Sequence, residues 1–396
     1  MFSSAPARRH SGMDFDDAAL ERYREDAKRF VDEHVTGEVL SRHAESGTAH
    51  DWDLHRAVAA SGVIADGLRT NERAGRDPLE IFVLFDELGL AGAPFYGLAN
   101  TMIVAGIIEE IGSDFHRCAV LPLLRSGTAI VAFGYSEPDA GSDLASCRTR
   151  ATRTSDGQWR IRGQKMFTSH AEASQFVILL TRTSDARHGG LTVFLVPLDR
   201  PGIEIQPMYA MSGERTNILF LSDVEVDDQW RLGEIDGGWD VLKIALAYER
   251  GVFGNTNQPV GLSQALLDWA RHARLANGDR VLDDPTVRVR LARIAIDSEV
   301  TALLGLRAAV IATNGGHPTI EGAAAKLFAS EAYVRAAQHC QDITGAAGLL
   351  DGSTGCAPGD GTIEHAVRDA PATTIYGGTS EVQRNLIAHL HLGLPR

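Results

Sequence analysis

The spacing of apolar residues predicts that the first part of the chain is α-helical. Between residues 14 and 127, apolar residues recur every three or four positions, which is the spacing of one buried helix face. Runs such as "DPLEIFVLFDELGLAGAPF" are more apolar throughout, and the glycines near their ends are typical helix stops. The run "DDAALERYREDAKRFVDEHV" is amphipathic and places five apolar side chains on one face: Leu20, Tyr23, Ala27, Phe30 and Val31.

The pattern changes at Ala129 to short runs rich in β-branched and aromatic residues, such as "QFVILLTRT" and "GLTVFLVPL". Such runs are typical of strands, and Asp156-Gly157 between two of them predicts a hairpin turn. After "DGGWD" the helical spacing returns over 240–275, 285–314, 321–347 and 378–392.

The sequence therefore predicts an α+β protein of three domains. We expect an N-terminal α-helical domain over residues 14–128 and a middle β-barrel or sandwich domain over 129–231. A C-terminal four-helix-bundle domain is expected over 232–396. A chain of 396 residues is long enough for more than one hydrophobic core.

Composition narrows the classes of function. The net charge of −14 argues against a nucleic-acid partner, because phosphates would be repelled. No run approaches the ~18 uncharged apolar residues of a membrane span, and the first residues lack the apolar segment of a secretory signal, so a disordered lead-in is expected. The cysteines are far apart in sequence, which predicts reduced thiols and a cytoplasmic location: Cys118, Cys147, Cys340 and Cys356.

The segment "AFGYSEPDAGSDLAS" over 132–146 is the richest in candidate chemistry. A strand gives way to Ser136-Glu137-Pro138, and Gly141 and Ser142 then combine close backbone approach with hydrogen-bond donors. This combination suits a polyanionic or heterocyclic ligand. Taken alone, it is more typical of an ordinary Pro/Gly loop capped by Ser142 and Asp143.

Two further segments carry candidate groups. In "GQKMFTSHAEAS", Phe167 offers a flat face and Thr168 and Ser169 offer hydroxyls; the competing interpretation is a half-buried strand phenylalanine. In "ALAYERGVFGN", Glu249 and Arg250 stand among apolar residues. Such surroundings would raise the pKa of a carboxyl and suit a general base, although exposed charged pairs are common.

The stretch "YGGTSE" begins a helix-like run with two glycines. It predicts a nest of backbone amides that would suit an anionic or carbonyl-rich ligand. The sequence contains no Gly-x-Gly-x-x-Gly after a strand, no His-Glu-x-x-His and no Gly-x-Ser-x-Gly. A Rossmann site, a zinc protease site and a serine hydrolase site are therefore disfavoured, and no metal is expected.

Taken together, the motifs resemble those of the acyl-CoA dehydrogenase family. The resemblance rests on the α–β–α order and on "YSEPDAGSD", "GQKMFTS", "DITGAAGLLD", "RDAPATTIYGGTSEVQR" and "LGLPR", and it spans the chain from about residue 14. It implies FAD as the cofactor and an acyl-CoA thioester as the substrate. The chain is particularly similar to the base-bearing subunit of actinobacterial heteromeric dehydrogenases that act on steroid side chains.

The resemblance also implies roles for individual residues. Phe167 stands where the family usually has tryptophan, so the stacking surface is kept and the indole N–H is lost. Ser142 and Arg250 are expected to contact the CoA substrate. The residues expected to bind FAD are Tyr135, Ser136, Gly141, Ser142, Phe167, Thr168, Ser169, Thr379 and Glu381.

The family resemblance points to the catalytic base because the usual glutamate is missing from its usual position. Many members carry a glutamate where this chain has Gly377, whereas a minority branch places it in an earlier Glu-Arg pair, which Glu249-Arg250 matches. Glu249 is thus expected to remove an α-proton while a β-hydride passes to flavin N5. The product would be the trans-2-enoyl-CoA, and an electron-transfer flavoprotein would reoxidise the flavin.

One part of the family pattern is missing. Family homotetramers usually carry Arg-x-x-Phe-Gly, which reaches the FAD of a neighbouring subunit, but "NGDRV" over 277–281 does not match it, and Asp342 and Ala346 replace the usual Gln and Gly. The chain is expected to work either in a heterotetramer with a related subunit or as a homo-oligomer. In the homo-oligomer another arginine would replace the lost contact: Arg271, Arg274 or Arg280.

Two alternative functions remain open on the same fold. One is a flavin-dependent oxidase or monooxygenase, which would use O₂ in place of a flavoprotein acceptor. The other is a non-catalytic subunit that only supports a partner. The sequence does not determine the acyl group, because chain-length pockets depend on packing.

Overall fold

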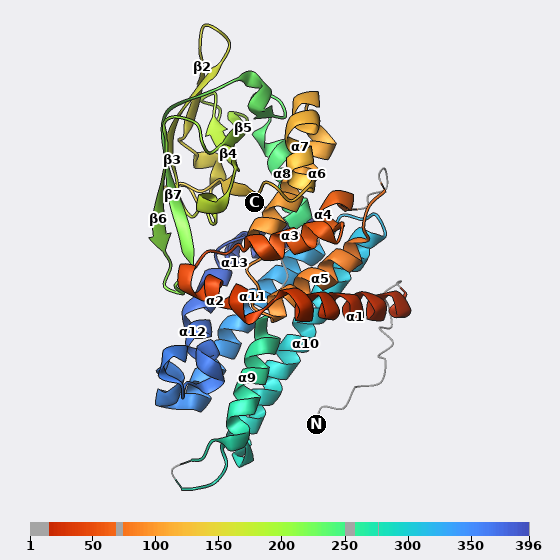
Figure 1. Cartoon of the computed structure of the whole chain (residues 1–396), viewed down its shortest axis with the longest axis vertical. Helices are drawn as coiled ribbons and strands as arrows, with labels where there is room; N and C mark the ends of the chain where they lie inside the picture. Colours follow the sequence, from red (N-terminus) through yellow and green to blue (C-terminus); the bar gives the residue numbers. More distant parts are fainter. Residues whose placement is uncertain (1–15, 69–73, 250–257, 276, 396) are drawn as a thin grey trace.

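The computed structural model describes residues 16–68, 74–249, 258–275 and 277–395 (Figure 1). Within these ranges helices come first, strands follow and helices return, so the predicted α+β architecture is confirmed. The expected disordered lead-in lies outside the described residues. The change from helix to strand falls between residues 125 and 131, and the change back between 232 and 238. The domain boundaries themselves stay a prediction.

The N-terminal part is helical. The predicted amphipathic run "DDAALERYREDAKRFVDEHV" forms α1. Leu20 and Ala27 are buried in it, and Tyr23, Phe30 and Val31 pack against the same core. The helices of this part are α1 (Asp17–His34), α2 (Gly37–Ser46), α3 (Trp52–Ala60), α4 (Val63–Asp66), α5 (Pro78–Leu90), α6 (Tyr96–Ile111), a π-helical turn (His116–Val120) and α7 (Leu121–Arg125).

The middle part is a single sheet with the strand order β6-β7-β3-β2-β4-β5-β8, and β1 pairs with β4. The predicted hairpin is confirmed: Gly157 has a φ of 89°, and its turn joins β2 to β3 in antiparallel register. The strands are β1 (Val131–Gly134), β2 (Arg150–Arg153), β3 (Trp159–Lys165), β4 (Phe176–Arg182), β5 (Leu191–Pro197), β6 (Ile203–Tyr209), β7 (Arg215–Val226) and β8 (Arg231–Leu232).

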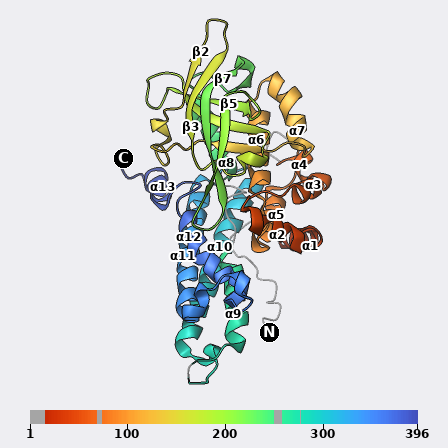
Figure 2. The ribbon, with the colours of Figure 1, turned by 60° about the vertical axis from the view of Figure 1, so that its left-hand side comes forward.

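The C-terminal part returns to helices. The long helices are α8 (Gly238–Tyr248), α9 (Gln258–His272), α10 (Pro285–Thr313) and α11 (Thr319–Thr344), and the shorter ones are α12 (Thr362–Thr373), α13 (Ser380–Leu386) and a π-helical turn (Ile387–His391). Figures 1 and 2 show α9, α10, α11 and α12 side by side in an elongated bundle below the sheet.

The predicted helix runs need one correction. In the run over 240–275, α8 ends at Tyr248 and α9 begins at Gln258, and residues 250–257 lie outside the described residues. Helix α12 was not predicted at all. It buries Ile363, Ala366 and Ala370 in the bundle core even though Pro371 lies inside it.

The central strands β4 and β5 are buried on both faces. Alternate residues of β4 divide between two cores: Ile178 packs in the core shared with α6 and α8, and Leu179 packs in the core of the sheet itself. Helix α8 contributes Val241 and Leu242 to the first core. The sheet therefore fixes the position of α8, whose C-terminal end leads into Glu249.

Hydrogen bonds join the N-terminal helices to the bundle. The Asp77 carboxylate caps α5 by accepting from the N–H of Leu79, and it also accepts from the hydroxyl of Thr313 at the end of α10, at 2.7 Å. None of the described helices is both long enough and apolar enough to cross a membrane. All four cysteines are free thiols, as predicted.

Candidate active site

A buried ion pair supports the loop that follows β1. The Lys165 ammonium lies 2.8 Å from a carboxylate oxygen of Glu137 and also donates to the carbonyl of Tyr135 at 3.3 Å. Glu137 accepts further hydrogen bonds from the backbone N–H groups of Arg148 and Thr149. Burial alone would raise the pKa of Glu137, but Lys165 and these hydrogen bonds lower it to about 2.

Phe167 follows directly after this supported region. The N–H of Met166 donates to the carbonyl of Ser136 at 2.9 Å, so the two predicted flavin segments lie side by side. Phe167 has a φ of 57°, which is rare for a residue other than glycine, and it is 62% exposed. A strained backbone that presents an aromatic face to the outside is typical of a ligand-binding position.

Thr168 and Ser169 continue the segment. Thr168 is held by two hydrogen bonds of 3.0 Å with Asn217, from backbone to backbone and from the amide side chain to the Thr168 carbonyl. Its hydroxyl is buried and has no hydrogen-bond partner among the described residues. The Ser169 hydroxyl makes a weak bond of 3.4 Å with Thr216.

Gly141 and Ser142 lie at the exposed end of the same loop. A Cβ at Gly141 would meet no atom within 4 Å, so packing within the chain does not require glycine there. The open space agrees with the predicted approach of a ligand to the backbone. Asp143, the next residue, pairs with Arg187 at 2.8 Å.

Glu249 reaches the position that Gly377 leaves vacant. A Cβ built at Gly377 would lie 3.0 Å from a carboxylate oxygen of Glu249, so the carboxylate occupies the space that a side chain at 377 would need. Packing of α8 against α6 supports this placement. A Cβ at Gly106 would lie 2.7 Å from the ring of Tyr248, whose hydroxyl donates to Glu110.

The two glycines form a turn with left-handed backbone angles, with φ values of 63° at Gly377 and 88° at Gly378. Gln383 donates to both of their carbonyls, and Lys326 donates to the Gly378 carbonyl at 2.6 Å. Within the described part of the chain, the N–H groups of the two glycines make no hydrogen bond. Among the described residues the turn therefore has two unpaired N–H donors, and the amide nest stays a prediction.

Thr379 and Glu381 follow the turn at the start of α13. The Thr379 hydroxyl accepts from the N–H of Val382 and so caps the helix, while Glu381 is exposed. The structure gives Thr379 this capping role, and the flavin contact of either residue stays a prediction. Arg250 lies outside the described residues.

Tyr135 links the two halves of the site. Its backbone belongs to the loop after β1, and its buried hydroxyl has no partner among the described residues. Burial first, and the negative charge of Glu249 second, raise the pKa of Tyr135 well above its usual value. Tyr135, Glu249 and Gly377 thus meet at one place, although they lie far apart in the sequence.

Three features of this region fit FAD: the exposed face of Phe167, the open space at Gly141, and the buried hydroxyls of Tyr135 and Thr168, which lack partners among the described residues. Sequence reasoning missed Lys165 and Lys326, as well as the role of Glu137. Glu137 and Lys165 stand inside the quoted motifs, but nothing in their local sequence distinguishes them from exposed charges.

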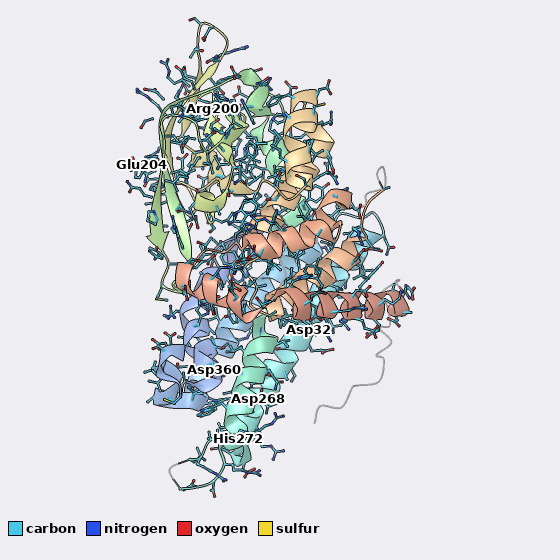
Figure 3. The ribbon with its side chains drawn as sticks, viewed as in Figure 1. Asp32, Arg200, Glu204, Asp268, His272 and Asp360 are labelled. Atoms are coloured by element: carbon cyan, nitrogen blue, oxygen red, sulfur yellow. The ribbon has the colours of Figure 1, made fainter. Side chains whose placement is uncertain are left out.

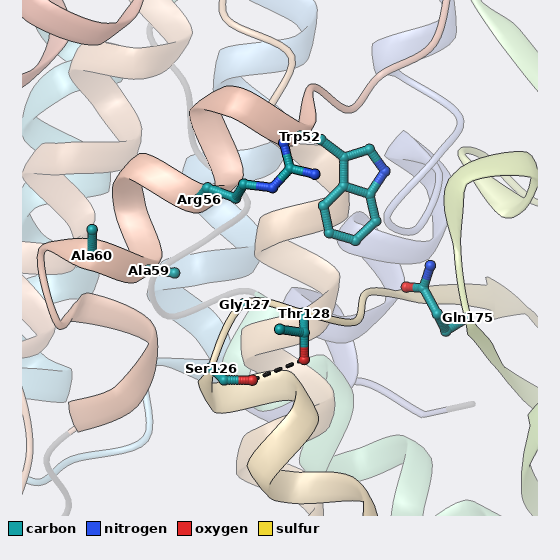
Figure 4. Close-up of a pocket in the computed structure, with 8 residues that line it drawn as sticks. All are labelled: Trp52, Arg56, Ala59, Ala60, Ser126, Gly127, Thr128 and Gln175. Atoms are coloured by element: carbon teal, nitrogen blue, oxygen red, sulfur yellow. Dashed lines mark hydrogen bonds between the residues drawn. The ribbon is translucent and has the colours of Figure 1, made fainter.

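A surface hollow of about 630 Å³ lies elsewhere (Figure 4). It is lined by Trp52 and Arg56 of α3, by the Ser126–Thr128 segment after α7, and by Gln175. None of the predicted site residues lines it. Its open, mixed lining provides neither a base nor a stack of donors, so we do not assign the chemistry to it.

Two of the three arginines named for the region of the missing Arg-x-x-Phe-Gly motif are paired, whereas Arg274 is exposed and forms no ion pair among the described residues. Arg271 donates to Asp268, which Figure 3 shows on α9, at 2.7 Å. Arg280 makes two hydrogen bonds with Asp283, at 2.8 and 2.9 Å. Each of these two arginines thus faces a carboxylate that would repel a pyrophosphate.

The second departure is also explained locally. Asp342, near the end of α11, forms an ion pair with Arg290 of α10. Ala346 lies in the short helical turn Gly345–Leu349 that follows α11. The Asp342 carboxylate therefore ties two bundle helices together.

Comparison with known proteins agrees with the site. Residues 132–228 match the family model of the acyl-CoA dehydrogenase middle domain, and residues 236–391 match that of the acyl-CoA dehydrogenase C-terminal domain. Acyl-CoA dehydrogenase FadE26 of Mycobacterium tuberculosis H37Rv is 32% identical over 81% of this chain and 82% of its own length.

Two solved structures are similar over nearly the whole chain. The ChsE4–ChsE5 complex from Mycobacterium tuberculosis has a TM-score of 0.84 and 31% identity, covering 96% of this chain and 98% of the other. The Tcur3481–Tcur3483 steroid acyl-CoA dehydrogenase has a TM-score of 0.83 and 29% identity, covering 96% and 99%. The chain therefore belongs to the acyl-CoA dehydrogenase family, whose members are FAD flavoprotein oxidoreductases.

Proposed function

We propose that the protein catalyses the α,β-dehydrogenation of an acyl-CoA thioester to the trans-2-enoyl-CoA, with Glu249 as the base that removes the α-proton. The observation that carries this proposal is the Glu249 carboxylate, 3.0 Å from the position where a side chain at residue 377 would begin. It brings a carboxylate to the turn where many family members carry their own.

The Gly377–Gly378 turn supplies the second part of the chemistry. A thioester carbonyl acidifies its α-hydrogens, and a hydrogen bond to that carbonyl from a free N–H of the turn stabilises the negative charge that develops on its oxygen. Gln383 holds the Gly377 carbonyl, which fixes the peptide plane that carries the Gly378 N–H, and Lys326 holds the Gly378 carbonyl.

The remaining residues hold and orient the partners of the reaction. Tyr135, Ser136, Gly141, Ser142, Phe167, Thr168, Ser169, Thr379 and Glu381 are proposed to bind FAD, with Ser142 and Arg250 also contacting the CoA substrate. FAD bound by these residues would supply the acceptor for the β-hydride at N5 and a route for the electrons to an electron-transfer flavoprotein. Every other step depends on groups of the protein itself.

We further propose a steroid whose side chain ends in a CoA thioester as the substrate class. The support is the similarity to the Tcur3481–Tcur3483 steroid acyl-CoA dehydrogenase. A panel of CoA thioesters tests it: butyryl, octanoyl and isovaleryl thioesters against a thioester of a carboxylated steroid side chain. Faster flavin bleaching by every simple thioester would contradict this assignment.

The test of the base is Glu249→Gln, which keeps the shape of the side chain and removes its ability to accept the proton. The variant should retain FAD and lose at least ~10²-fold in the rate of flavin bleaching by substrate. Glu204→Gln, an exposed glutamate of β6, is the matched control and should bleach at the wild-type rate. Near-normal turnover of Glu249→Gln would overturn the assignment.

The electron acceptor that reoxidises the reduced flavin distinguishes a dehydrogenase from an oxidase. Flavin reduced anaerobically by substrate should stay reduced for minutes after exposure to air and should reoxidise rapidly with a ferrocenium acceptor. Rapid reoxidation by air alone would favour the oxidase or monooxygenase. If no thioester bleaches the flavin in a preparation that contains both FAD and the partner subunit, the chain would instead be a non-catalytic supporting subunit.

A further inference from the structure

Lys326 is a buried lysine next to the proposed base. It lies on the inner side of α11 and is only 9% exposed, which is unusual for a lysine unless its charge has partners. Its ammonium donates to the carbonyl of Gly378 at 2.6 Å. One neutral carbonyl leaves most of the cost of burying a charge uncompensated, so the other groups around Lys326 decide its role.

Glu249 and Lys326 meet at the same glycine. The Cβ position of Gly377 lies 3.0 Å from a carboxylate oxygen of Glu249 and 3.9 Å from the last carbon of the Lys326 side chain before its nitrogen. The base and the ammonium therefore approach the turn together. They come from different helices, the end of α8 and the middle of α11.

Three carboxylates act on the Lys326 ammonium: Glu249, then Glu331 and Glu381. Glu331 also pairs with Arg384, and Glu381 is exposed, so water and a second cation weaken the attraction of these two for Lys326. Burial lowers the pKa of Lys326 to about 8, while the three carboxylates act in the opposite direction. Lys326 is thus still charged at neutral pH.

We propose that Lys326 is a positioning residue for the base: its ammonium fixes the Gly377–Gly378 turn and keeps the Glu249 carboxylate ionised. A nearby positive charge in a site of low dielectric favours the ionised form of a carboxyl. Only that form accepts the α-proton. The inference rests on the proposed function, in which Glu249 is the base.

The test is the pH dependence of anaerobic flavin bleaching, with the CoA thioester that reacts fastest in the panel. Lys326→Met removes the charge and keeps the length of the side chain. The acidic limb of its profile should move to higher pH by about one unit or more, because the base then protonates more easily. Lys326→Arg, which keeps the charge, should leave the limb near its wild-type position.

Arg335→Met is the matched control, because it removes one positive charge from the same helix at a side chain that is 42% exposed and pairs with Asp297, which is not among the carboxylates that act on Lys326. Its acidic limb should not move. A purely structural role of Lys326 would lower the rate at every pH and leave the limb in place, and that result would overturn the inference. If Lys326→Met fails to fold, Lys326→Gln answers the same question.

Glu249→Gln, measured in parallel, separates the two proposals. Wild-type bleaching in Glu249→Gln would overturn the base and the inference together. Loss of flavin bleaching in Glu249→Gln, together with an acidic limb that does not move in Lys326→Met, would overturn the inference and leave the base assignment intact.

A measurement without substrate gives a second readout. Because the folded pKa of Lys326 lies below its unfolded value of 10.5, the unfolded state binds the extra proton between pH 8 and 10.5. Wild-type stability should therefore rise relative to Lys326→Met across that range. A constant difference would contradict the buried, charged state on which the inference depends.

Discussion

Gly377 satisfies two separate constraints at once. Its φ of 63° disfavours any residue with a Cβ, and the carboxylate of Glu249 takes up the space beside it. Neither constraint alone explains why this position carries glycine. Together they make the site sensitive to any substitution of Gly377.

We predict that Gly377→Ala lowers turnover at least ~10-fold, because the new methyl group displaces the base as well as straining the turn. Gly355→Ala is the matched control: its φ is 66°, but nothing lies within 4 Å of its Cβ position. Both variants place a Cβ at a similar positive φ, and only one touches Glu249. Turnover of Gly377→Ala as high as that of Gly355→Ala would contradict the prediction. Steady-state rates with a ferrocenium acceptor measure the difference.

At the scale of elements, the loop after β1 depends on the buried pair between Lys165 and Glu137. Removing the lysine leaves an unpaired buried carboxylate, which typically costs about 3–5 kcal/mol. We predict that Lys165→Met lowers the free energy of unfolding by roughly that amount and reduces the ratio of FAD to protein. Urea unfolding and flavin absorbance after dialysis measure the two effects.

The double variant Lys165→Met with Glu137→Gln is the control for this pair. It removes both charges, so it should recover part of the stability lost in the single variant. A double variant as unstable as the sum of the two single ones would show that the residues act independently. The pH dependence adds a check: the pKa of Glu137 is depressed, so its contribution is present above about pH 4.5 and is lost as pH falls toward 2.

The sequence predicted the elements with strong periodicity and missed those set by packing. Helix α1 and the hairpin at Gly157 follow from local patterns alone. Helix α12 was missed because Pro371 and a run of threonines mask its apolar positions, and its burial against α11 overrides the local preference.

The candidate site shows the same division. Glu249 was predicted because the glycine at 377 made the absence of the usual base visible in the sequence. Lys326 was not, because its surroundings come from α8 and from the turn before α13, more than fifty residues away in either direction. Which groups face a lysine inside a helix is decided by tertiary contacts that one sequence does not display.

For the whole molecule, buried histidines predict a loss of stability in acid. Burial is the main cause that lowers the pKa of His55, His116 and His170 to about 4 and that of His50 to about 2. The unfolded state binds their protons below pH 6.5 and the folded state does not. Each buried histidine therefore lowers the free energy of unfolding by up to about 1.4 kcal/mol per pH unit as pH falls from 6.5 toward the pKa of that histidine in the folded state.

Glu214 acts in the opposite direction, because burial, followed by the charge of Asp369, raises its pKa to about 7. As pH falls from 7 to 4.5, protonation of Glu214 stabilises the folded state by about as much as one buried histidine destabilises it. We predict a net fall in the free energy of unfolding between pH 6.5 and 5, measured by urea unfolding. His50→Leu should flatten the slope, and a flat profile for the wild type would contradict the buried neutral state of the histidines.

The paired arginines bear on the assembly. Arg271 and Arg280 are bound to aspartates and Asp342 is bound to Arg290, so of the three candidate arginines Arg274 alone is left without an ion pair among the described residues for the FAD of a second copy. We predict that it works with a different but related subunit, because the usual Arg-x-x-Phe-Gly is missing from this chain. Expressed alone it should hold FAD poorly, and co-expression with that subunit should restore both flavin and turnover.

Mass measurement and flavin content test this prediction on the purified protein. A homo-oligomer with one tightly bound FAD per chain and full activity would contradict it. Arg280→Gln is informative in that case: if a homo-oligomer uses Arg280 across the interface, the variant should lose flavin. In a mixed assembly the same variant should keep it.

The hydrogen bond between Asp77 and Thr313 spans 236 positions of sequence. Helix α5, which Asp77 caps, buries residues around its whole circumference and packs against α1 and α10. During synthesis, α5 leaves the ribosome long before α10 exists, so one of its apolar faces stays uncovered while the whole sheet is being made. A nascent chain that stops short of residue 285 should therefore recruit chaperones that bind exposed apolar helices, and one that extends past residue 313 should release them.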